Sequence, residues 1–226
     1  PYSIMDYYDI DPDLAVNPQN RMAEFEETVA RIHEKGMKVI IDFIPNHLAR
    51  EYKSLCKPYD VEEFGEYDNK NVSFSKDNNF YYCPDQRFVI PNNHNVIGST
   101  NMEFHEFPAK ASGNDVFSPT PSVNDWYDTV KLNYGVDYHN NNRYFEPIPN
   151  TWYKMLNILR YWCEKGVDGF RVDMAEMVPV EFWRWSIDML RENYEPIMIA
   201  EIYQPHLYKE FIYAGFDYLY DKVGLY

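Results

Sequence analysis

Carboxylic acids end three short apolar runs of this sequence. The segment VIID ends in Asp42, GFRVD ends in Asp173, and IMIAE ends in Glu201. Arg171 stands two residues before Asp173, so the two side chains share one face of a strand. Charged groups in a buried run are costly unless they are paired or used. These residues therefore form either a structural ion pair or a working site.

Two close carboxyls of this kind suit the hydrolysis of a glycosidic bond. If the runs ending in Asp173 and Glu201 are neighbouring parallel strands, about 4.8 Å apart, their carboxyls can come within about 5–5.5 Å. At that separation, one carboxylate of a retaining glycosidase attacks the anomeric carbon and the other carboxyl protonates the leaving oxygen. Close carboxyls also push their pKa values apart, which gives one base and one acid. The guanidinium fork of Arg171 would hold Asp173 ionised and aimed.

Two other uses of these acids stay open at this point. An acid at the end of a strand often caps a helix or faces solvent, which would make the set purely structural. The same acids could instead bind a divalent cation at the mouth of a barrel. Asp42, Asn46 and His47 could contribute ligands to such a site.

The elements that must position these acids follow a repeated pattern. A helical apolar spacing is followed by a glycine or polar stop and then by a short buried run, which is typical of parallel βα architecture. The predicted helix and strand segments are 19–35 with 37–42, 151–165 with 167–173, 179–193 with 195–201, and 208–215 with 216–226. The carboxyl ends of such strands form the active-site rim of a (β/α)₈ barrel. A doubly wound open sheet is the competing layout, but no GxGxxG or P-loop follows any run.

Composition narrows the function classes. The 226 residues suffice for one large or two ordinary domains, and the formal charge of −15 disfavours nucleic acid and anionic membrane surfaces as partners. No apolar run approaches the ~20 residues that a membrane span requires, so we expect no membrane insertion. Aromatic residues make up 18% of the chain, which suits either sugar-binding platforms or ordinary core packing. Three cysteines without CxxC spacing predict no zinc site; we expect free buried thiols, with a Cys56–Cys83 bridge as the alternative.

A long irregular region separates the first and second repeats. Residues 48–150 are rich in Asn, Pro and Tyr and lack the helical periodicity of the flanking segments. Long loops in compact proteins are usually functional or form a small domain. The high aromatic content argues against disorder, so we expect an inserted domain over the barrel mouth.

Several motifs, in this order, resemble the α-amylase superfamily (glycoside hydrolase family 13). They are DFIPNH at 42–47, GFRVD at 169–173 and IAE at 199–201, preceded by the opening PYSIMDYYDIDP and followed by FDYLYDKVGLY. The resemblance covers essentially the whole chain and implies an α/β fold, a (β/α)₈ TIM barrel that is incomplete in this chain, with a domain B inserted after the third strand. It implies a barrel segment at 1–47 (second-strand loop to third strand), domain B at 48–148, and a second barrel segment at 149–226 (fourth to sixth strands).

The resemblance also implies roles for individual residues. Asp173 would be the catalytic nucleophile, Glu201 the general acid/base, and Arg171 the residue that orients the nucleophile. It also implies that His47 binds a sugar hydroxyl, that Tyr2 stacks on the same sugar, and that Asp42 supports the site. The implied activity is retaining hydrolysis of α-glucosidic bonds, α-1,4 bonds first, in starch, glycogen or maltooligosaccharides. An α-glucan transglycosylase and a non-catalytic amylase-like scaffold, as in some transporter partner subunits, are the alternatives.

Three departures from the family pattern bear on these expectations. Glu176 and Met177 replace the Lys-His pair that usually follows the nucleophile and lines the subsite beyond the cleaved bond, so they are expected to contact substrate. Lys131 stands where many members carry a calcium-binding aspartate, and Met177 removes another ligand. We therefore expect no required cofactor and no calcium site, although Asn46 would be a ligand if one were kept. The first strand and the last motif of the family are absent, so we expect this segment to be inactive alone.

Overall fold

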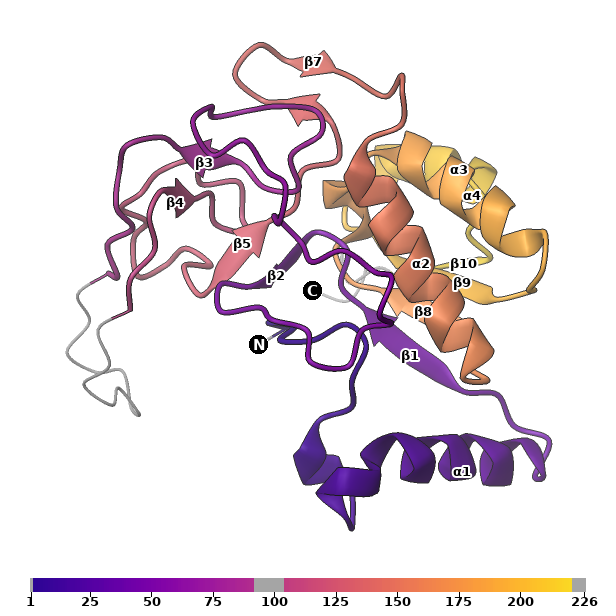
Figure 1. The fold of residues 1–226 in the computed structure, drawn as a ribbon. Coiled ribbons are helices and arrows are strands. Elements are labelled where there is room, and N and C mark those ends of the chain that lie inside the picture. The colour runs from indigo at the N-terminus through magenta and orange to yellow at the C-terminus, as the bar shows by residue number, and fades with distance from the viewer. Residues whose placement is uncertain (1, 92–103, 221–226) are drawn as a thin grey trace. The chain divides into compact units, whose positions relative to one another are not determined.

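The structure, a computed structural model, describes residues 2–91 and 104–220, and its contacts divide the chain into two compact units (Figure 1). The first unit consists of Pro1–Met5, His47–Tyr52 and Glu62–Thr151, and the second of Asp6–Asn46, Lys53–Val61 and Trp152–Tyr226. Part of the expected insertion, residues 92–103, and the last residues of the expected sixth strand, 221–226, lie outside the described residues. The domain boundaries given above stay a prediction.

Helices and strands alternate in the second unit, as the sequence predicts. The helices are α1 (Arg21–His33), α2 (Asn150–Glu164), α3 (Val180–Arg191) and α4 (Tyr208–Tyr213), with 3₁₀ turns η1 (Pro12–Leu14), η2 (Pro18–Asn20), η3 (Ala175–Met177) and η4 (Pro205–Leu207). The strands are β1 (Ile40–Phe43), β8 (Gly169–Val172), β9 (Ile197–Glu201) and β10 (Tyr218–Tyr220). β1 begins later than expected and extends past Asp42, so this acid lies inside the strand rather than at its end.

The four strands form one parallel sheet in the order β1-β8-β9-β10 (Figure 1). The register places Asp42 opposite Arg171 and Tyr220 opposite Glu201. Because the strands are parallel, their carboxyl ends meet at one edge of the sheet, which is where the acids stand. The predicted parallel βα arrangement is confirmed for this part of the chain.

An aromatic core packs behind the strand ends. The ring centroid of Trp183, in α3, lies 6.4 Å from that of Phe43 in β1 and 5.2 Å from that of Phe216, which precedes β10. Its indole N–H donates to the Ala175 carbonyl oxygen at 3.2 Å, so the buried nitrogen has a partner. Trp183 and Phe170 of β8 are fully buried. Burial of rings this large holds the strands, and with them the acids, in fixed register.

Glycines end the first two helices of this unit where the sequence predicts a stop. Gly36 follows α1 with φ +71°, and Gly166 follows α2 with φ +89°. A residue with a Cβ is strained in this left-handed region, whereas glycine is not. The chain can therefore leave each helix and enter the next strand within a few residues.

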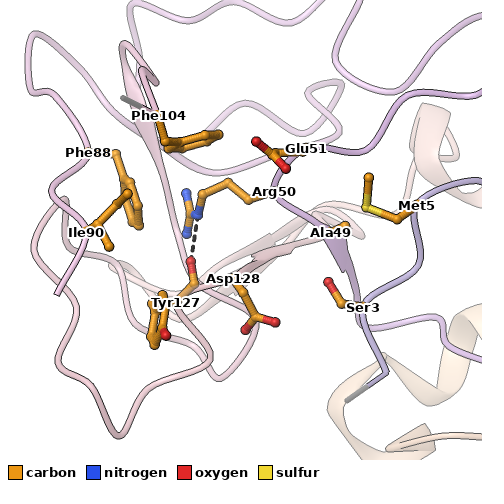
Figure 2. Close-up of a pocket in the computed structure, with 10 residues that line it drawn as sticks. All are labelled: Ser3, Met5, Ala49, Arg50, Glu51, Phe88, Ile90, Phe104, Tyr127 and Asp128. Carbon is orange, nitrogen blue, oxygen red and sulfur yellow. Dashed lines mark hydrogen bonds between the residues drawn. The ribbon is translucent and has the colours of Figure 1, made fainter. Parts of the chain in front are cut away.

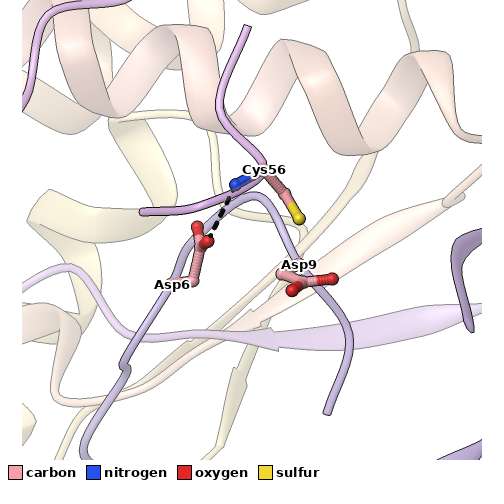
Figure 3. Close-up of side chains that lie close together, drawn as sticks. All are labelled: Asp6, Asp9 and Cys56. Atoms are coloured by element: carbon pink, nitrogen blue, oxygen red, sulfur yellow. Dashed lines mark hydrogen bonds between the residues drawn. The ribbon is translucent and has the colours of Figure 1, made fainter. Parts of the chain in front are cut away.

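The side chains of Asp6, Asp9 and Cys56 lie close together and connect the segment Lys53–Val61 with the start of the second unit (Figure 3). Both carboxylate oxygens of Asp9 accept hydrogen bonds from Arg21 at 2.6 Å, and these bonds lower the pKa of Asp9 although burial opposes them. Asp6 accepts the backbone N–H groups of Tyr8, Leu55 and Cys56 and the hydroxyl of Ser54. The Arg21 guanidinium pairs with Asp9, and N–H and O–H donors of the protein occupy Asp6, so the geometry of this cluster is that of a structural joint.

The cysteines are free thiols, as expected, but Cys56 is exposed rather than buried. Its position explains the difference, because it belongs to the surface joint just described and its sulfur lies 3.4 Å from Arg21 Nη2. None of the helices formed by residues 2–91 and 104–220 is long and apolar enough to cross a bilayer.

The strands in the described part of the first unit form short antiparallel pairs. β2 (His47–Ala49) pairs with β5 (Thr129–Lys131), β3 (Tyr82–Cys83) with β4 (Ala109–Lys110), and β6 (Val136–Asp137) with β7 (Asn142–Arg143). Side chains satisfy much of the remaining backbone. Asp68 accepts the N–H groups of Asn79 and Phe80, and the buried Asn133 amide donates to the carbonyls of Ser75 and Asn78. The abundant Asn and Asp residues thus hold an irregular chain in one conformation.

Arg50 is the central polar group of the first unit. Its five N–H groups donate to Glu106 Oε1, Ser112 Oγ and the carbonyl oxygens of Lys110, Tyr127 and Thr129, and its guanidinium lies 3.8 Å from the centroid of the Phe88 ring. Beside it lies a cavity of about 300 Å³ (Figure 2). Ser3, Met5, Ala49, Glu51, Phe88, Ile90, Phe104, Tyr127 and Asp128 complete the lining. Since every donor of Arg50 is used within the unit, this arginine stabilises the fold of the cavity wall.

Candidate active site

Three acids and one arginine meet at the carboxyl edge of the parallel sheet. Arg171 Nη1 lies 2.9 Å from Asp173 Oδ1 and 3.7 Å from Asp42 Oδ1, while its Nη2 lies 2.9 Å from Glu201 Oε2. β8 supplies Arg171, and Asp173 directly follows the last residue of this strand. Glu201 is the last residue of β9. The register of three neighbouring strands therefore brings together the four residues that the sequence singles out.

The carboxyls of Asp173 and Glu201 are close enough for each to affect the pKa of the other. Both residues are buried, with 6% and 3% of their surfaces exposed. The Asp173 backbone N–H donates to the Phe43 carbonyl at 2.8 Å, which continues the β1–β8 pairing beyond the strand. The two carboxyls thus form one proton-binding pair shielded from bulk water.

The surroundings shift the pKa values of the two carboxyls in opposite directions. Burial and the neighbouring Glu201 carboxylate raise the pKa of Asp173 to about 6, against the opposing effect of Arg171. Burial alone would also raise the pKa of Glu201, but the Tyr203 hydroxyl, the Met174 N–H and Arg171 outweigh it and lower that pKa. Arg171 thus favours the ionised form of Asp173, in the expected direction, and its orienting role stays a prediction.

Two groups at this site were missed by the sequence-based prediction. The Tyr203 hydroxyl donates to Glu201 Oε1, and the Met174 backbone N–H donates to Glu201 Oε2 at 3.1 Å. Tyr203 stands two residues after Glu201. If the strand that ends in Glu201 had been predicted to continue to Tyr203, the period-2 rule would have placed the two side chains on the same face. Met174 has φ +46° and ψ +43°, a left-handed conformation that a methionine rarely adopts and that no sequence pattern indicates.

Glu176 and Met177 lie in η3, directly after Asp173 and Met174. Both are half-buried. Glu176 Oε2 accepts the backbone N–H groups of Tyr203 at 3.0 Å and Gln204 at 3.1 Å. The carboxylate of Glu176 is thus bound to the neighbouring loop, and a substrate contact by either residue stays a prediction.

His47 and Tyr2 belong to the first unit. His47 Nε2 lies 2.9 Å from the Tyr2 carbonyl oxygen, and since a carbonyl can only accept, this nitrogen carries the proton. Burial lowers the pKa of His47 to about 4, with Lys131 adding to the effect, so the imidazole is neutral at neutral pH. The Tyr2 side chain is half exposed. The sugar contacts expected of both residues stay predictions.

Lys131 forms part of the same unit and does not suit a calcium site. It is 2% exposed, and its Nζ lies 2.7 Å from Asp115 Oδ1. An ammonium group repels a cation and offers no oxygen ligand. Asn46, in the second unit, is fully buried and already has an interaction partner. The donor set expected from the resemblance therefore does not fit calcium at Lys131.

This combination of a parallel βα sheet with a buried carboxyl pair at its carboxyl edge is typical of barrel-type glycosidases. Residues 1–192 match the family described as "Alpha amylase, catalytic domain". The chain belongs to the α-amylase family.

Similar proteins include both enzymes and a transporter subunit. Maltase A1 of Drosophila melanogaster is 28% identical, over 94% of this chain and 32% of that protein. The amino acid transporter heavy chain SLC3A1 of Homo sapiens is 27% identical, over 78% of this chain and 21% of that protein. The maltogenic α-amylase AmyB of Thermotoga neapolitana is 26% identical with a TM-score of 0.53, over 100% of this chain and 37% of that one. The chain thus spans about a third or less of these relatives and has the fold of part of a (β/α)₈ barrel.

Proposed function

We propose that this chain carries the nucleophile and the general acid/base of a glycoside hydrolase that cleaves α-glucosidic bonds, α-1,4 bonds first, with retention of configuration. The substrates would be starch, glycogen or maltooligosaccharides. The observation that carries the proposal is the buried pair of Asp173 and Glu201, with Arg171 2.9 Å from each carboxyl. The names of relatives, a maltase and a maltogenic α-amylase among them, support an α-glucoside as the substrate.

The chemistry proceeds in two steps. An oxygen of ionised Asp173 attacks the anomeric carbon while the glycosidic bond breaks and the leaving oxygen takes a proton from Glu201, which leaves a glycosyl ester on Asp173. Glu201, now ionised, then removes a proton from water as its oxygen attacks the same carbon, and Asp173 is released.

One proton on the carboxyl pair is required for the first step. Because the two carboxyls interact closely, this proton can pass to Glu201 when a glycosidic oxygen approaches. Arg171 contacts both carboxyls, so it stabilises whichever of them is ionised.

The anomeric form of the first product tests this proposal. In the full-length protein, a maltooligosaccharide digest followed by proton NMR should show the α-anomer before mutarotation. The β-anomer as first product would overturn the retaining mechanism. Products longer than the substrate would assign the activity to a transglycosylase, in which a sugar hydroxyl replaces water in the second step.

A non-catalytic scaffold is the second candidate, because the transporter heavy chain SLC3A1 is among the similar proteins. The arrangement of Asp173, Glu201 and Arg171 favours an enzyme, since two buried carboxyls and a half-buried guanidinium without a catalytic use would be costly. Absence of any turnover on α-glucans and α-glucosides by the folded full-length protein would favour the scaffold.

Chelation is expected to leave the activity unchanged. The Lys131 ammonium, paired with Asp115, stands in place of a calcium ligand, and the carboxyl pair needs no metal for either chemical step. Activity and thermal midpoint should therefore be the same before and after exhaustive dialysis against a chelator. A loss of activity that added calcium restores would contradict this expectation and revive the metal alternative.

A further inference from the structure

The loops after β8 and β9 hold each other by hydrogen bonds in both directions. From the first loop, the Met174 N–H donates to Glu201 Oε2 at 3.1 Å. From the second loop, the N–H groups of Tyr203 and Gln204 donate to Glu176 Oε2 at 3.0 and 3.1 Å. The carboxylate of Glu176 thus satisfies two backbone donors directly after the strand that ends in Glu201.

Tyr203 connects this clamp to the carboxyl pair. Its backbone N–H is held by Glu176, and its hydroxyl donates to Glu201 Oε1. A residue held at its backbone and bound at its tip has little freedom to turn its hydroxyl away. The chain of contacts therefore runs from Glu176 through Tyr203 to Glu201.

Charged groups at the carboxyl edge of the sheet surround Glu201. Its carboxyl interacts with that of Asp173, Arg171 Nη2 lies 2.9 Å away, and Asp42 contacts the same arginine at 3.7 Å. The ring of Tyr220, opposite Glu201 in the register, has its centroid 5.7 Å from Arg171 Cζ. Glu176 does not touch Glu201 in any of these contacts, and the Tyr203 segment is the route by which the contacts connect them.

We propose that Glu176 is a positioning residue that keeps the Tyr203 hydroxyl on the Glu201 carboxylate and thereby sets the pH range in which the pair retains its catalytic proton. This inference rests on the proposed function of Glu201 as general acid/base. It also explains why an acid is useful at position 176, where the family often carries a lysine. A lysine at 176 has no acceptor for the two backbone N–H groups, whereas a carboxylate has.

The test compares pH profiles of kcat/KM in the full-length protein. The high-pH limb reports loss of the proton from the pair, and removing a donor to the anion strengthens proton binding. Tyr203→Phe should therefore move this limb upward by about one pH unit or more, as loss of a hydrogen bond to a charged group implies. Glu176→Lys should move it in the same direction, and Glu176→Gln, which keeps one accepting oxygen, should move it less.

The double variant Glu176→Lys/Tyr203→Phe separates positioning from a direct charge effect. If Glu176 acts through Tyr203, the double variant should have the same limb as Tyr203→Phe alone. A further shift of equal size in the double variant would overturn the inference, because the charge would then act through space. Glu192→Lys, an equal charge change at an exposed position after α3, is the matched control and should leave the limb unmoved.

Other outcomes are equally decisive. A Glu176→Lys variant that keeps its thermal midpoint and an unshifted limb would refute the inference while leaving the proposed function intact. Full activity of Asp173→Ala or Glu201→Gln would refute the proposed function itself. If Glu176→Lys lowers the thermal midpoint, the two milder variants Glu176→Gln and Tyr203→Phe still test the inference. The high-pH limb should move in the same direction in both, and less in Glu176→Gln.

Discussion

Replacing Asp173 by alanine is expected to lower kcat on maltooligosaccharides by on the order of 10⁴-fold or more in the full-length protein, as loss of a catalytic nucleophile does elsewhere. The variant has no atom that can form the glycosyl ester, and the half-buried Arg171 loses one of its carboxylate partners. Substrate binding should persist, since the carboxyl reacts only after binding. Steady-state rates, together with substrate affinity by calorimetry, measure the two effects separately.

The matched control for this variant is Asp168→Asn, an acid directly before the same strand. Asp168 accepts hydrogen bonds from Lys38 Nζ at 2.9 Å and the Val39 N–H at 2.8 Å and lies 2.6 Å from His33 Nε2. Burial opposes but does not outweigh these contacts, so the pKa of Asp168 is lowered to about 2. A lowered pKa adds stability above the ordinary carboxyl pKa that is lost as the pH falls towards 2. Asp168→Asn should therefore reduce stability and leave kcat unchanged.

A loss of kcat in Asp168→Asn as large as in Asp173→Ala would contradict the assignment, because both ends of the strand would then matter equally. In a barrel enzyme the catalytic residues lie at the carboxyl ends of the strands, so a residue at the opposite end should not affect kcat. Nearly unchanged activity of Asp173→Ala would equally remove Asp173 as nucleophile.

Replacing Glu201 by glutamine is expected to produce the second-largest effect, a loss of about 10²–10⁴-fold on maltooligosaccharides. The amide cannot deliver a proton to the glycosidic oxygen, and the bond must break to an alkoxide. An α-glucosyl fluoride has a leaving group that needs no proton, so ester formation from this substrate should be much less affected. The ratio of kcat/KM for the two substrates is the diagnostic quantity.

Glu195→Gln is the control for this second variant, because Glu195 is an exposed acid shortly before the other end of β9. It should change neither substrate's rate. If Glu201→Gln lowers both substrates by the same factor, its role is structural or electrostatic and not that of a proton donor.

Much of the site could be predicted because it depends on strand periodicity. Arg171 and Asp173 share a face by the period-2 rule, and parallel strands bring Glu201 to the same edge, so three of the four charged groups follow from spacing. The contact of Arg171 with Glu201 could not be foreseen, because it depends on the rotamer of a long side chain. The raised pKa of Asp173 depends on burial, which no local pattern measures.

The clamp formed by Glu176 lay beyond sequence-based prediction for a different reason. The loop that carries Glu176 begins at Met174, whose left-handed backbone favours glycine and asparagine rather than methionine. Propensities therefore do not predict the conformation of this loop. In the first unit the same holds for Arg50 and Asn133, whose buried polar contacts join segments far apart in the chain.

The most direct test of the account is to trap the glycosyl-enzyme ester. The full-length protein would be incubated with a fluorinated α-glucosyl fluoride that forms the ester quickly and hydrolyses it slowly, then digested and analysed by mass spectrometry. The account predicts that the peptide containing Asp173 gains the mass of one fluoroglucosyl group, with fragmentation placing it on that side chain. A label on any other residue of the active, intact protein, or inactivation without a covalent label, would contradict it.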